Sequence, residues 1–183
     1  RAFSSVDRLY GQGAYNSLRN ASAAIVGIGG VGSWAAEAIA RHGVSSISLI
    51  DLDNVAESNI NRQIQALQPT LGMAKVDALA GRIALINPEC LVTRIEDFLT
   101  PENAADLLSS RPDVVLDCTD QSSAKVAMAE HCHLEGLTLF MAGAAGAAGW
   151  ASAGCSAGRC VPDHQVAVTT TASVARFTAR GTR

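Results

Sequence analysis

Short apolar runs alternate with helix-forming segments from Ser22 to Met141, and this alternation limits the possible folds more than any other feature. Runs of Ile, Val, Leu and Ala that end in glycine or aspartate are typical of strands buried on both faces of a sheet. The expected strands are residues 23–26, 46–50, 91–95, 114–116 and 137–141, and the expected helices are residues 31–42, 70–86, 101–108 and 122–135. Such alternation predicts an α/β fold, a Rossmann-like parallel sheet with flanking helices and right-handed crossovers.

Particular residues set the expected helix boundaries. Gly43 is placed to end the first of these helices. Thr70 can cap the second, which the Asn87-Pro88 pair then breaks. Pro101 suits the first turn of the third helix, because its missing N–H costs nothing there.

The composition is that of one globular domain. The chain has 183 residues, of which 48% are hydrophobic and 17% are charged, enough for a single core. No apolar run approaches the roughly 20 residues that a membrane-spanning helix needs, so we expect a cytoplasmic protein with no transmembrane segment. The net charge of −3 gives no overall electrostatic signature for nucleic acid, although it leaves room for a local patch.

The cysteine pattern argues against a structural metal site. The five cysteines are Cys90, Cys118, Cys132, Cys155 and Cys160, and no two of them form a CxxC pair. Structural zinc sites commonly use such pairs, so we expect none in this chain. The first three lie among apolar or helical neighbours, which favours buried, reduced thiols.

A glycine-rich segment joins the first expected strand to the first expected helix, with glycines at Gly27, Gly29, Gly30 and Gly32. Glycines between a strand and a helix allow a tight turn and close approach of a phosphate, and the helix N-terminus supplies oriented N–H donors. The segment therefore predicts a nucleotide site without naming the nucleotide. The alternative is close packing of the helix on the strand without a ligand.

Polar residues after the second strand favour a triphosphate. Asp51 ends that strand, where a carboxylate accepts hydrogen bonds from ribose hydroxyls in NAD and ATP sites alike, although it could also be a turn residue. A dinucleotide site has little use for Asn59, Arg62 and Lys75, which follow it. An arginine and a lysine can together stabilise the charge that grows on a leaving pyrophosphate.

A pair of aspartates ends the fourth strand. Asp117 and Asp120 lie at the edge of the sheet where a ligand is expected. Asp120 can hold Mg²⁺ through its carboxylate, because hard cations prefer oxygen ligands. Either aspartate could instead cap the helix that follows.

These motifs, in this order, resemble the E1-like superfamily (the ThiF, MoeB and HesA proteins). The matching patterns are GxGGxGS, DxDxVxxSNxNRQ, the later lysine and DxxD. The resemblance implies an E1-like domain with ATP contacts from the glycine segment, Asp51, Asn59, Arg62 and Lys75. It also implies a magnesium-linked carboxylate at Asp120, with Arg62, Lys75 and Asp120 as the catalytic set. Arg8 resembles an N-terminal arginine that reaches the ATP of a partner subunit, which implies a homodimer.

Within the superfamily, residues 86–90, 96–98 and 142–146 look most like the tRNA threonylcarbamoyladenosine dehydratases. That resemblance implies a tRNA substrate carrying threonylcarbamoyladenosine (t6A), whose threonyl carboxylate is activated by adenylation and then cyclised. A cysteine desulfurase and sulfur-acceptor system is a further implied partner. A mild departure is Gln121, which stands where asparagine usually follows the second aspartate.

Three alternatives stay open on the sequence alone. An adenylyltransferase that activates the C-terminus of a sulfur-carrier or ubiquitin-like protein would use the same ATP motifs. An inactive nucleotide-binding fragment is compatible with the composition after residue 146, where residues 147–183 read as an irregular tail without family resemblance. We therefore expect residues 1–146 to form the ATP-binding domain and the fold to be incomplete at the C-terminus. An NAD-dependent oxidoreductase would leave Arg62 and Lys75 unexplained.

Overall fold

The sheet is parallel throughout the part of the chain that the computed structural model describes, residues 3–142. Its strands are β1 (Ser22–Val26), β2 (Ser46–Ile50), β3 (Leu91–Ile95), β4 (Val114–Asp117) and β5 (Leu139–Met141), in the order β3-β2-β1-β4-β5. This is the order of a Rossmann-like, doubly wound sheet. The chain moves outward from β1 to β3 and then returns to the other side of β1, so the order reverses between β1 and β4. The predicted fold class is confirmed.

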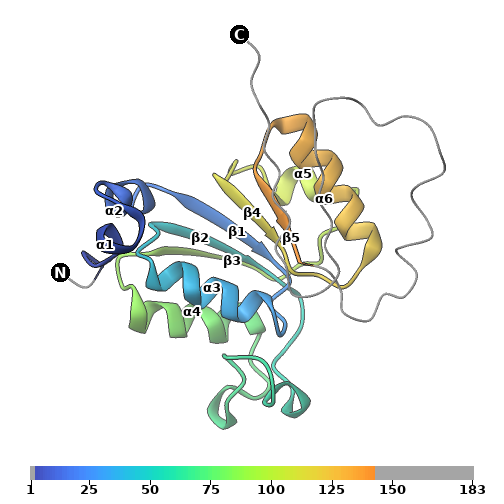
Figure 1. The fold of residues 1–183 in the computed structure, drawn as a ribbon. Coiled ribbons are helices and arrows are strands. Elements are labelled where there is room, and N and C mark those ends of the chain that lie inside the picture. The colour runs from blue at the N-terminus through green and yellow to red at the C-terminus, as the bar shows by residue number, and fades with distance from the viewer. Residues whose placement is uncertain (1–2, 143–183) are drawn as a thin grey trace.

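Helices cover both faces of the sheet (Figure 1). The helices are α1 (Val6–Tyr10), α2 (Ala14–Leu18), α3 (Gly32–Arg41), α4 (Lys75–Ile86), α5 (Ala104–Leu107) and α6 (Ser122–Glu135). Helices α3 and α4 pack on one face, and α5 and α6 pack on the other. A long segment between β2 and α4, which contains the 3₁₀ turns η1 (Glu57–Asn59) and η2 (Gln68–Thr70), projects away from the sheet.

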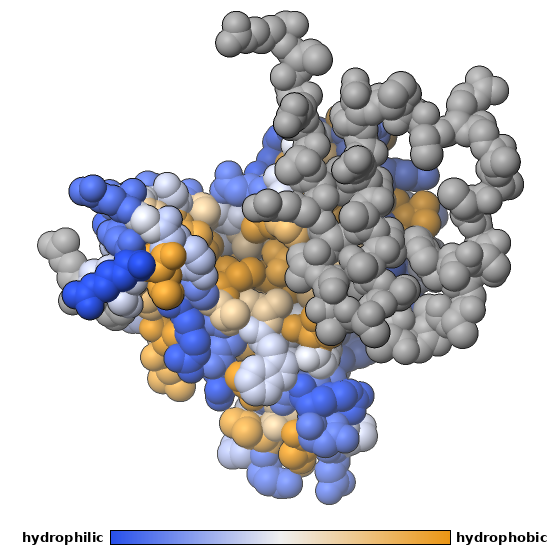
Figure 2. Space-filling view, viewed as in Figure 1, coloured by the Kyte–Doolittle hydropathy of each residue, from blue (hydrophilic) through white to orange (hydrophobic). Residues whose placement is uncertain are grey.

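Two hydrophobic cores follow from the two faces. Along β1, Ala23 and Ile25 join the core under α3 and α4, while Ala24 and Val26 join the core under α5 and α6. Alternate side chains of a strand point to opposite faces, so burial on both faces requires the continuous apolar run found here. Figure 2 shows apolar residues gathered over the middle of one side of the molecule, between the α1–α2 end and α6.

The predicted start of the second helix is wrong. Thr70 does not cap α4: its hydroxyl donates to the Gln65 carbonyl oxygen at 2.6 Å and accepts from the Leu67 N–H at 2.9 Å, within the turn before the helix. The chain then stays extended, because Ala74 pairs with Asn54 in an isolated antiparallel bridge. Helix α4 therefore begins only at Lys75. A threonine that satisfies its hydroxyl locally favours a turn over a helix start.

Two further boundaries differ from those predicted. The third predicted helix shortens to Ala104–Leu107, because the Asn103 side chain accepts the Thr100 N–H and holds a turn after Pro101. The last strand begins at Leu139 instead of Leu137. Gly136 ends α6 with a φ of 66°, and the Leu137 N–H donates to the Cys132 carbonyl, so Leu137 belongs to the helix cap. Across residues 3–142 we find no helix of the length and apolarity that a membrane span requires.

Candidate functional site

A cleft opens at the carboxyl ends of β1, β2 and β4, beside the point where the strand order reverses. Its volume is about 580 Å³, within the range of small-molecule sites. Open α/β sheets bind their ligands at this position because the loops that leave neighbouring strands diverge there. Eight of the predicted site residues line the cleft: Gly27, Gly29, Gly30, Asp51, Asn59, Arg62, Lys75 and Asp120.

The glycines of the first loop serve two different purposes. Gly27 has a φ of 88°, and a Cβ there would lie 2.9 Å from the backbone of Cys118. A Cβ on Gly32 would lie 1.8 Å from the Gly27 carbonyl oxygen, so helix α3 can approach the loop only with glycine at this position. Gly32 does not line the cleft. Glycine is needed there for close packing of the helix on the strand, which is the alternative that the sequence left open. Gly29 and Gly30 line the cleft and add no side chain to it.

Asp51 holds the glycine loop in place. Its Oδ2 accepts the Ile28 N–H at 2.6 Å and its Oδ1 accepts the Asp53 N–H at 2.9 Å, although the residue is only 7% exposed. Each carboxylate oxygen can accept more than one hydrogen bond, so Asp51 keeps acceptor capacity on its cleft side. It thus fixes the loop and still faces the cleft.

Asn59 and Arg62 reach the cleft from the projecting segment. Asn59 is buried, and its Oδ1 accepts the Ala56 N–H at 3.0 Å, which closes the 3₁₀ turn. Arg62 is exposed and its Nη1 donates to the Ser58 carbonyl at 2.8 Å. A Cβ on Gly30 would lie 3.5 Å from the Arg62 side chain, so this arginine passes over the glycine loop. The Trp34 indole fixes its backbone by donating to the Arg62 carbonyl at 2.9 Å.

Lys75 is the first residue of α4 and is buried. Its Nζ lies 2.7 Å from Asp53 Oδ2 and 3.7 Å from Asp51 Oδ1. An ammonium group has three donors, so Lys75 can keep Asp53 and still donate to a bound anion. Lys75, which the sequence predicts as a cation of the site, therefore lies at the cleft, and two carboxylates hold its side chain in place.

Sequence reasoning missed several lining residues. Asp53, Asp97 and Phe98 also line the cleft, the last two because β3 ends beside β2. Gln63 lines it as well, and its Oε1 accepts from Gln65 Nε2, which also donates to the Ile28 carbonyl. These amides tie the projecting segment to the glycine loop. The signal that could have found Asp97 is its position two residues after the end of β3, at the same edge of the sheet as Asp51.

Asp120 and Asp117 have different environments. Asp120 is exposed and lines the cleft, whereas Asp117 is fully buried and pairs with Lys125, with Asp117 Oδ2 at 2.9 Å from Lys125 Nζ. Asp117 Oδ1 accepts the Thr119 N–H and hydroxyl, so it does fix the turn before α6. Lys125 was not anticipated from the sequence.

Arg8 stands apart from the other predicted site residues. It is exposed on α1 and does not line the cleft of its own chain. Figure 1 shows α1 and α2 together at one end of the sheet, away from the projecting segment. Within one chain, the structure therefore does not bring Arg8 together with the other predicted site residues.

The described cysteines are poor nucleophiles. Burial, and then the charge of Asp117, raises the pKa of Cys118 to about 12, and the same two effects raise the pKa of Cys132 to about 11. Burial also raises the pKa of Cys90. Thiols with pKa values this high are protonated at neutral pH, and the thiolate is the reactive form. Cys118 therefore lines the cleft as a neutral group.

The cleft carries more negative than positive side chains. Asp51, Asp53, Asp97 and Asp120 line it together with Arg62 and Lys75, which gives four carboxylates and two cations. Within residues 3–142, no cluster of three or more His, Cys, Asp or Glu side chains is arranged to hold a metal ion by protein ligands alone. A polyphosphate that enters this cleft would therefore need an additional cation. That cation would be bound jointly by the phosphate oxygens and by protein carboxylates.

A glycine loop, a buried aspartate after β2 and two cations converging on a switch-point cleft define a nucleotide-binding α/β domain. The ThiF family model matches residues 4–182. The chain therefore belongs to the ThiF family, as the motifs predicted.

The similar proteins include dehydratases that act on tRNA threonylcarbamoyladenosine and adenylyltransferase–sulfurtransferases. The tRNA threonylcarbamoyladenosine dehydratase of Escherichia coli is 46% identical over 144 residues, which cover 79% of this chain and 54% of that protein. The crystal structure of that dehydratase in complex with ATP superposes with a TM-score of 0.77 and covers 79% of this chain and 60% of that one. The adenylyltransferase and sulfurtransferase uba4 of Pyricularia oryzae is 38% identical over 117 residues, covering 64% of this chain and 24% of that protein. This chain thus spans about half the length of the dehydratases it matches.

Proposed function

We propose that this chain carries the nucleotide-binding part of an ATP-dependent tRNA threonylcarbamoyladenosine dehydratase. The observation that carries the proposal is the convergence of Arg62 and Lys75, from separate segments, on a cleft that Gly29 and Gly30 also line. Identity supports it, because the dehydratases of Escherichia coli, Haemophilus influenzae and Bacillus subtilis are 46%, 40% and 42% identical to this chain. The Escherichia coli dehydratase has been crystallised with ATP and with AMP.

The chemistry follows from the charges of the cleft. The threonyl carboxylate of t6A attacks the α-phosphorus of ATP, and the bond to pyrophosphate breaks. Arg62 and Lys75 stabilise the negative charge that grows on the leaving pyrophosphate. A nitrogen of the same modification then attacks the acyl carbon and AMP leaves, with net loss of water from the nucleoside. This intramolecular step needs no enzyme thiol, because the attacking nitrogen is already held close.

Mg²⁺ fits the cleft as a counter-ion, since the lining carboxylates outnumber the lining cations. Asp120 is the residue proposed to hold it, because its exposed carboxylate lines the cleft. Magnesium is usually bound by one or two carboxylates together with substrate phosphates. When bound, the ion neutralises charge on the phosphates and orients them.

The remaining parts of the proposal concern partners. We propose a homodimer in which Arg8 of each chain contacts the nucleotide of the other, because Arg8 is exposed and outside its own cleft. The tRNA substrate, a cytoplasmic location and a link to a cysteine desulfurase system rest on the resemblance to the dehydratases.

ATP–pyrophosphate exchange tests the function. The chain should catalyse exchange in the presence of tRNA that carries t6A and not with the same tRNA lacking the modification. The competing function is adenylation of a sulfur-carrier C-terminus, which the 38% identity to the adenylyltransferase and sulfurtransferase uba4 favours. Exchange that depends on a sulfur-carrier protein and ignores tRNA would establish that function instead. Binding of ATP without exchange in either assay would identify an inactive nucleotide-binding fragment.

The nucleotide itself is tested separately by thermal melting. ATP with Mg²⁺ should raise the melting temperature of the chain, because a ligand that binds only the folded state stabilises it. NAD should have no effect, and Asp51→Asn should reduce the shift given by ATP. Protection by NAD and none by ATP would favour an oxidoreductase.

A further inference from the structure

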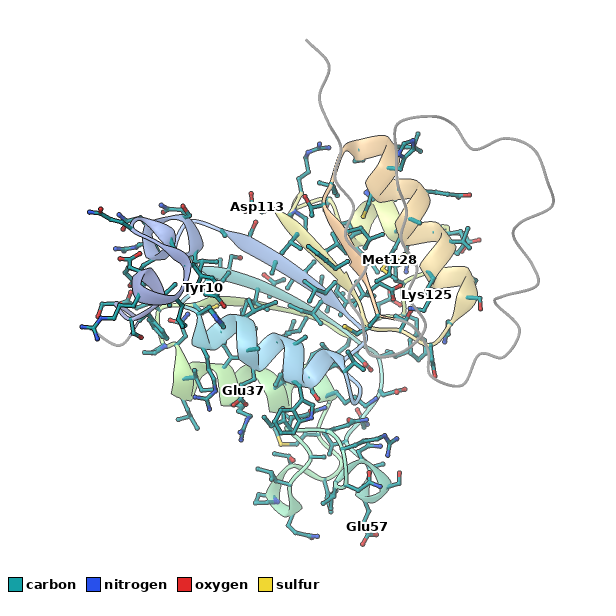
Figure 3. The ribbon with its side chains drawn as sticks, in the orientation of Figure 1. Tyr10, Glu37, Glu57, Asp113, Lys125 and Met128 are labelled. Atoms are coloured by element: carbon teal, nitrogen blue, oxygen red, sulfur yellow. The ribbon has the colours of Figure 1, made fainter. Side chains whose placement is uncertain are left out.

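Lys125 is a buried cation that the chemistry above does not use. It lies near the start of α6 and is 6% exposed. Its Nζ donates to Asp117 Oδ2 at 2.9 Å and to the Ala142 carbonyl oxygen at 2.8 Å. Asp117 is the last residue of β4 and Ala142 directly follows β5, so one ammonium group joins the ends of two strands to a helix. Figure 3 shows Lys125 on the same helix as the core residue Met128.

The pair lies directly behind one wall of the cleft. Cys118, Thr119, Asp120 and Ala142 line the cleft, whereas Asp117 and Lys125 do not. One oxygen of the Asp117 carboxylate accepts from Lys125. The other accepts from the N–H and hydroxyl of Thr119, at 3.0 and 2.8 Å. The turn that carries Asp120 is thus tied at its base to a fixed carboxylate.

The energetics favour a geometric role over a purely stabilising one. Burying an ion pair has a desolvation cost, and an apolar residue of similar volume is often at least as stabilising. The neighbouring α6 residues Ala124, Met128 and Cys132 belong to the apolar core, so an apolar side chain would suit this position. An ion pair with three further hydrogen bonds fixes direction, which apolar contacts do not.

We propose that Lys125 is a positioning residue: with Asp117 and Ala142 it fixes the turn from which Asp120 presents its carboxylate to the nucleotide-bound magnesium. The inference rests on the proposed binding of ATP with Mg²⁺. It predicts that the effect of Lys125 on ligand binding passes through Asp120 and appears only when the metal is present. A residue that merely stabilised the fold would affect binding with and without metal alike.

A double-mutant cycle measured by calorimetry tests this. Lys125→Met should weaken binding of ATP in Mg²⁺ about tenfold, the scale of coupling between residues in one network. Its affinity for ATP in EDTA should stay within about twofold of the parent's, near the limit of additivity for independent sites. In an Asp120→Asn background, Lys125→Met should have no further effect. Lys125→Arg, which keeps the charge, should restore part of the metal-dependent affinity.

Arg82→Met is the matched control, because Arg82 pairs with the buried Glu37 between α3 and α4, outside the cleft. It should leave the ratio of affinities in Mg²⁺ and EDTA unchanged. Additive effects of Lys125→Met and Asp120→Asn, or an equal loss in EDTA, would overturn the inference and leave the proposed function standing. A parent chain that binds no ATP would instead overturn the proposed function.

Hydrogen exchange on the parent chain gives a second measurement that needs no variant. ATP with Mg²⁺ should slow amide exchange from Asp117 to Lys125, whereas ATP with EDTA should slow it only in the glycine loop. Where Lys125→Met does not fold, the Asp117→Asn/Lys125→Met variant leaves no buried charge unpaired and enters the same cycle. Equal protection of the Asp117 turn with and without metal would count against a link between this pair and the metal.

Discussion

The ammonium group of Lys75 lies 2.7 Å from the Asp53 carboxylate, and the Lys75 backbone N–H donates to the Asp53 carbonyl at 2.9 Å. Lys75 is the first residue of α4, where the helix dipole disfavours a cation. Asp53 offsets that cost and holds the side chain at the cleft. The two residues therefore act as a unit that presents one positive charge in a fixed position.

Removing either cation of the cleft should slow adenylation. Arg62→Ala and Lys75→Ala should each reduce the rate of ATP–pyrophosphate exchange by about 10²-fold, the usual effect of removing one preorganised electrostatic contact. Arg62 is exposed, so its variant should melt close to the parent. Lys75→Ala leaves Asp51 buried without its cation and should also lower the melting temperature. Exchange at parental rates in both variants would contradict the assignment of this segment.

The central strands β1 and β4 could be predicted from the sequence because each is a short, mostly apolar run, as burial between helices on both faces of a parallel sheet requires. The edge strand β3 is mostly exposed, and its apolar ends Leu91 and Ile95 were the signal there. The start of α4 could not, because Thr70 bonds within its own turn. Asp97 was missed because its place in the cleft depends on β3 lying beside β2, which only the strand order decides. The buried position of Lys125 could not be predicted, because it depends on the hydrogen bonds to Asp117 and Ala142. A lysine near the start of a helix, where the helix dipole disfavours a cation, was nevertheless a signal of a special environment.

Two matched glycine variants distinguish the packing role of the glycine loop from its role in ATP binding. Gly32→Ala should prevent or severely impair folding, because its Cβ would lie 1.8 Å from the Gly27 carbonyl oxygen. Gly29→Ala has no atom within 4 Å of the added Cβ, so it should fold normally and weaken ATP binding by adding a methyl group to the lining of the cleft. Circular dichroism and calorimetry of both variants measure the two effects. A stable Gly32→Ala chain would show that α3 can move away from the loop.

Cys118 should be unreactive although it lines the cleft. Its pKa of about 12 keeps the thiol protonated at neutral pH, whereas the thiolate is the form that iodoacetamide alkylates. Mass spectrometry of the folded chain should therefore find Cys118 alkylated far more slowly than in the urea-unfolded chain. Cys118→Ala should retain ATP binding and exchange. Rapid alkylation, or loss of exchange in the alanine variant, would point to a thiol intermediate in place of direct cyclisation.

Glu37 should make the chain sensitive to acid. Burial acts to raise its pKa, but the hydrogen bonds and charges of Arg82 and Arg41 outweigh burial and hold the pKa below the ordinary 4.5. A depressed carboxylate pKa stabilises the fold above the unfolded-state pKa, and the contribution is lost as the pH falls through the folded-state value. Urea unfolding should thus show stability falling below about pH 4.5. Figure 3 shows Glu37 on α3, on the side of the sheet away from α6.

Glu37→Gln is the variant that isolates this effect. It should be less stable than the parent at neutral pH, because the amide keeps one acceptor oxygen for the two guanidinium groups and loses both ion pairs. Its stability should fall less steeply on the acid side than the parent's. The same steepness in both chains would assign the acid sensitivity to other carboxylates.

Arg8 and Lys75 allow a test of whether two chains build each site. In a symmetric dimer where Arg8 serves the neighbouring cleft, a chain with Arg8→Ala keeps its own Lys75, and a chain with Lys75→Ala supplies its own Arg8 to the other cleft. The mixed dimer then has one complete site and one site lacking both residues. When equal amounts of the two variants exchange subunits at random, half of the dimers are mixed, and each mixed dimer has one complete site of two. The mixture should therefore show about a quarter of the parental ATP–pyrophosphate exchange activity. Each variant alone should be nearly inactive.

If Arg8 served its own cleft, the mixed dimer would contain no complete site, and mixing would restore nothing. An Arg8→Ala chain that is as active as the parent would remove Arg8 from the site altogether.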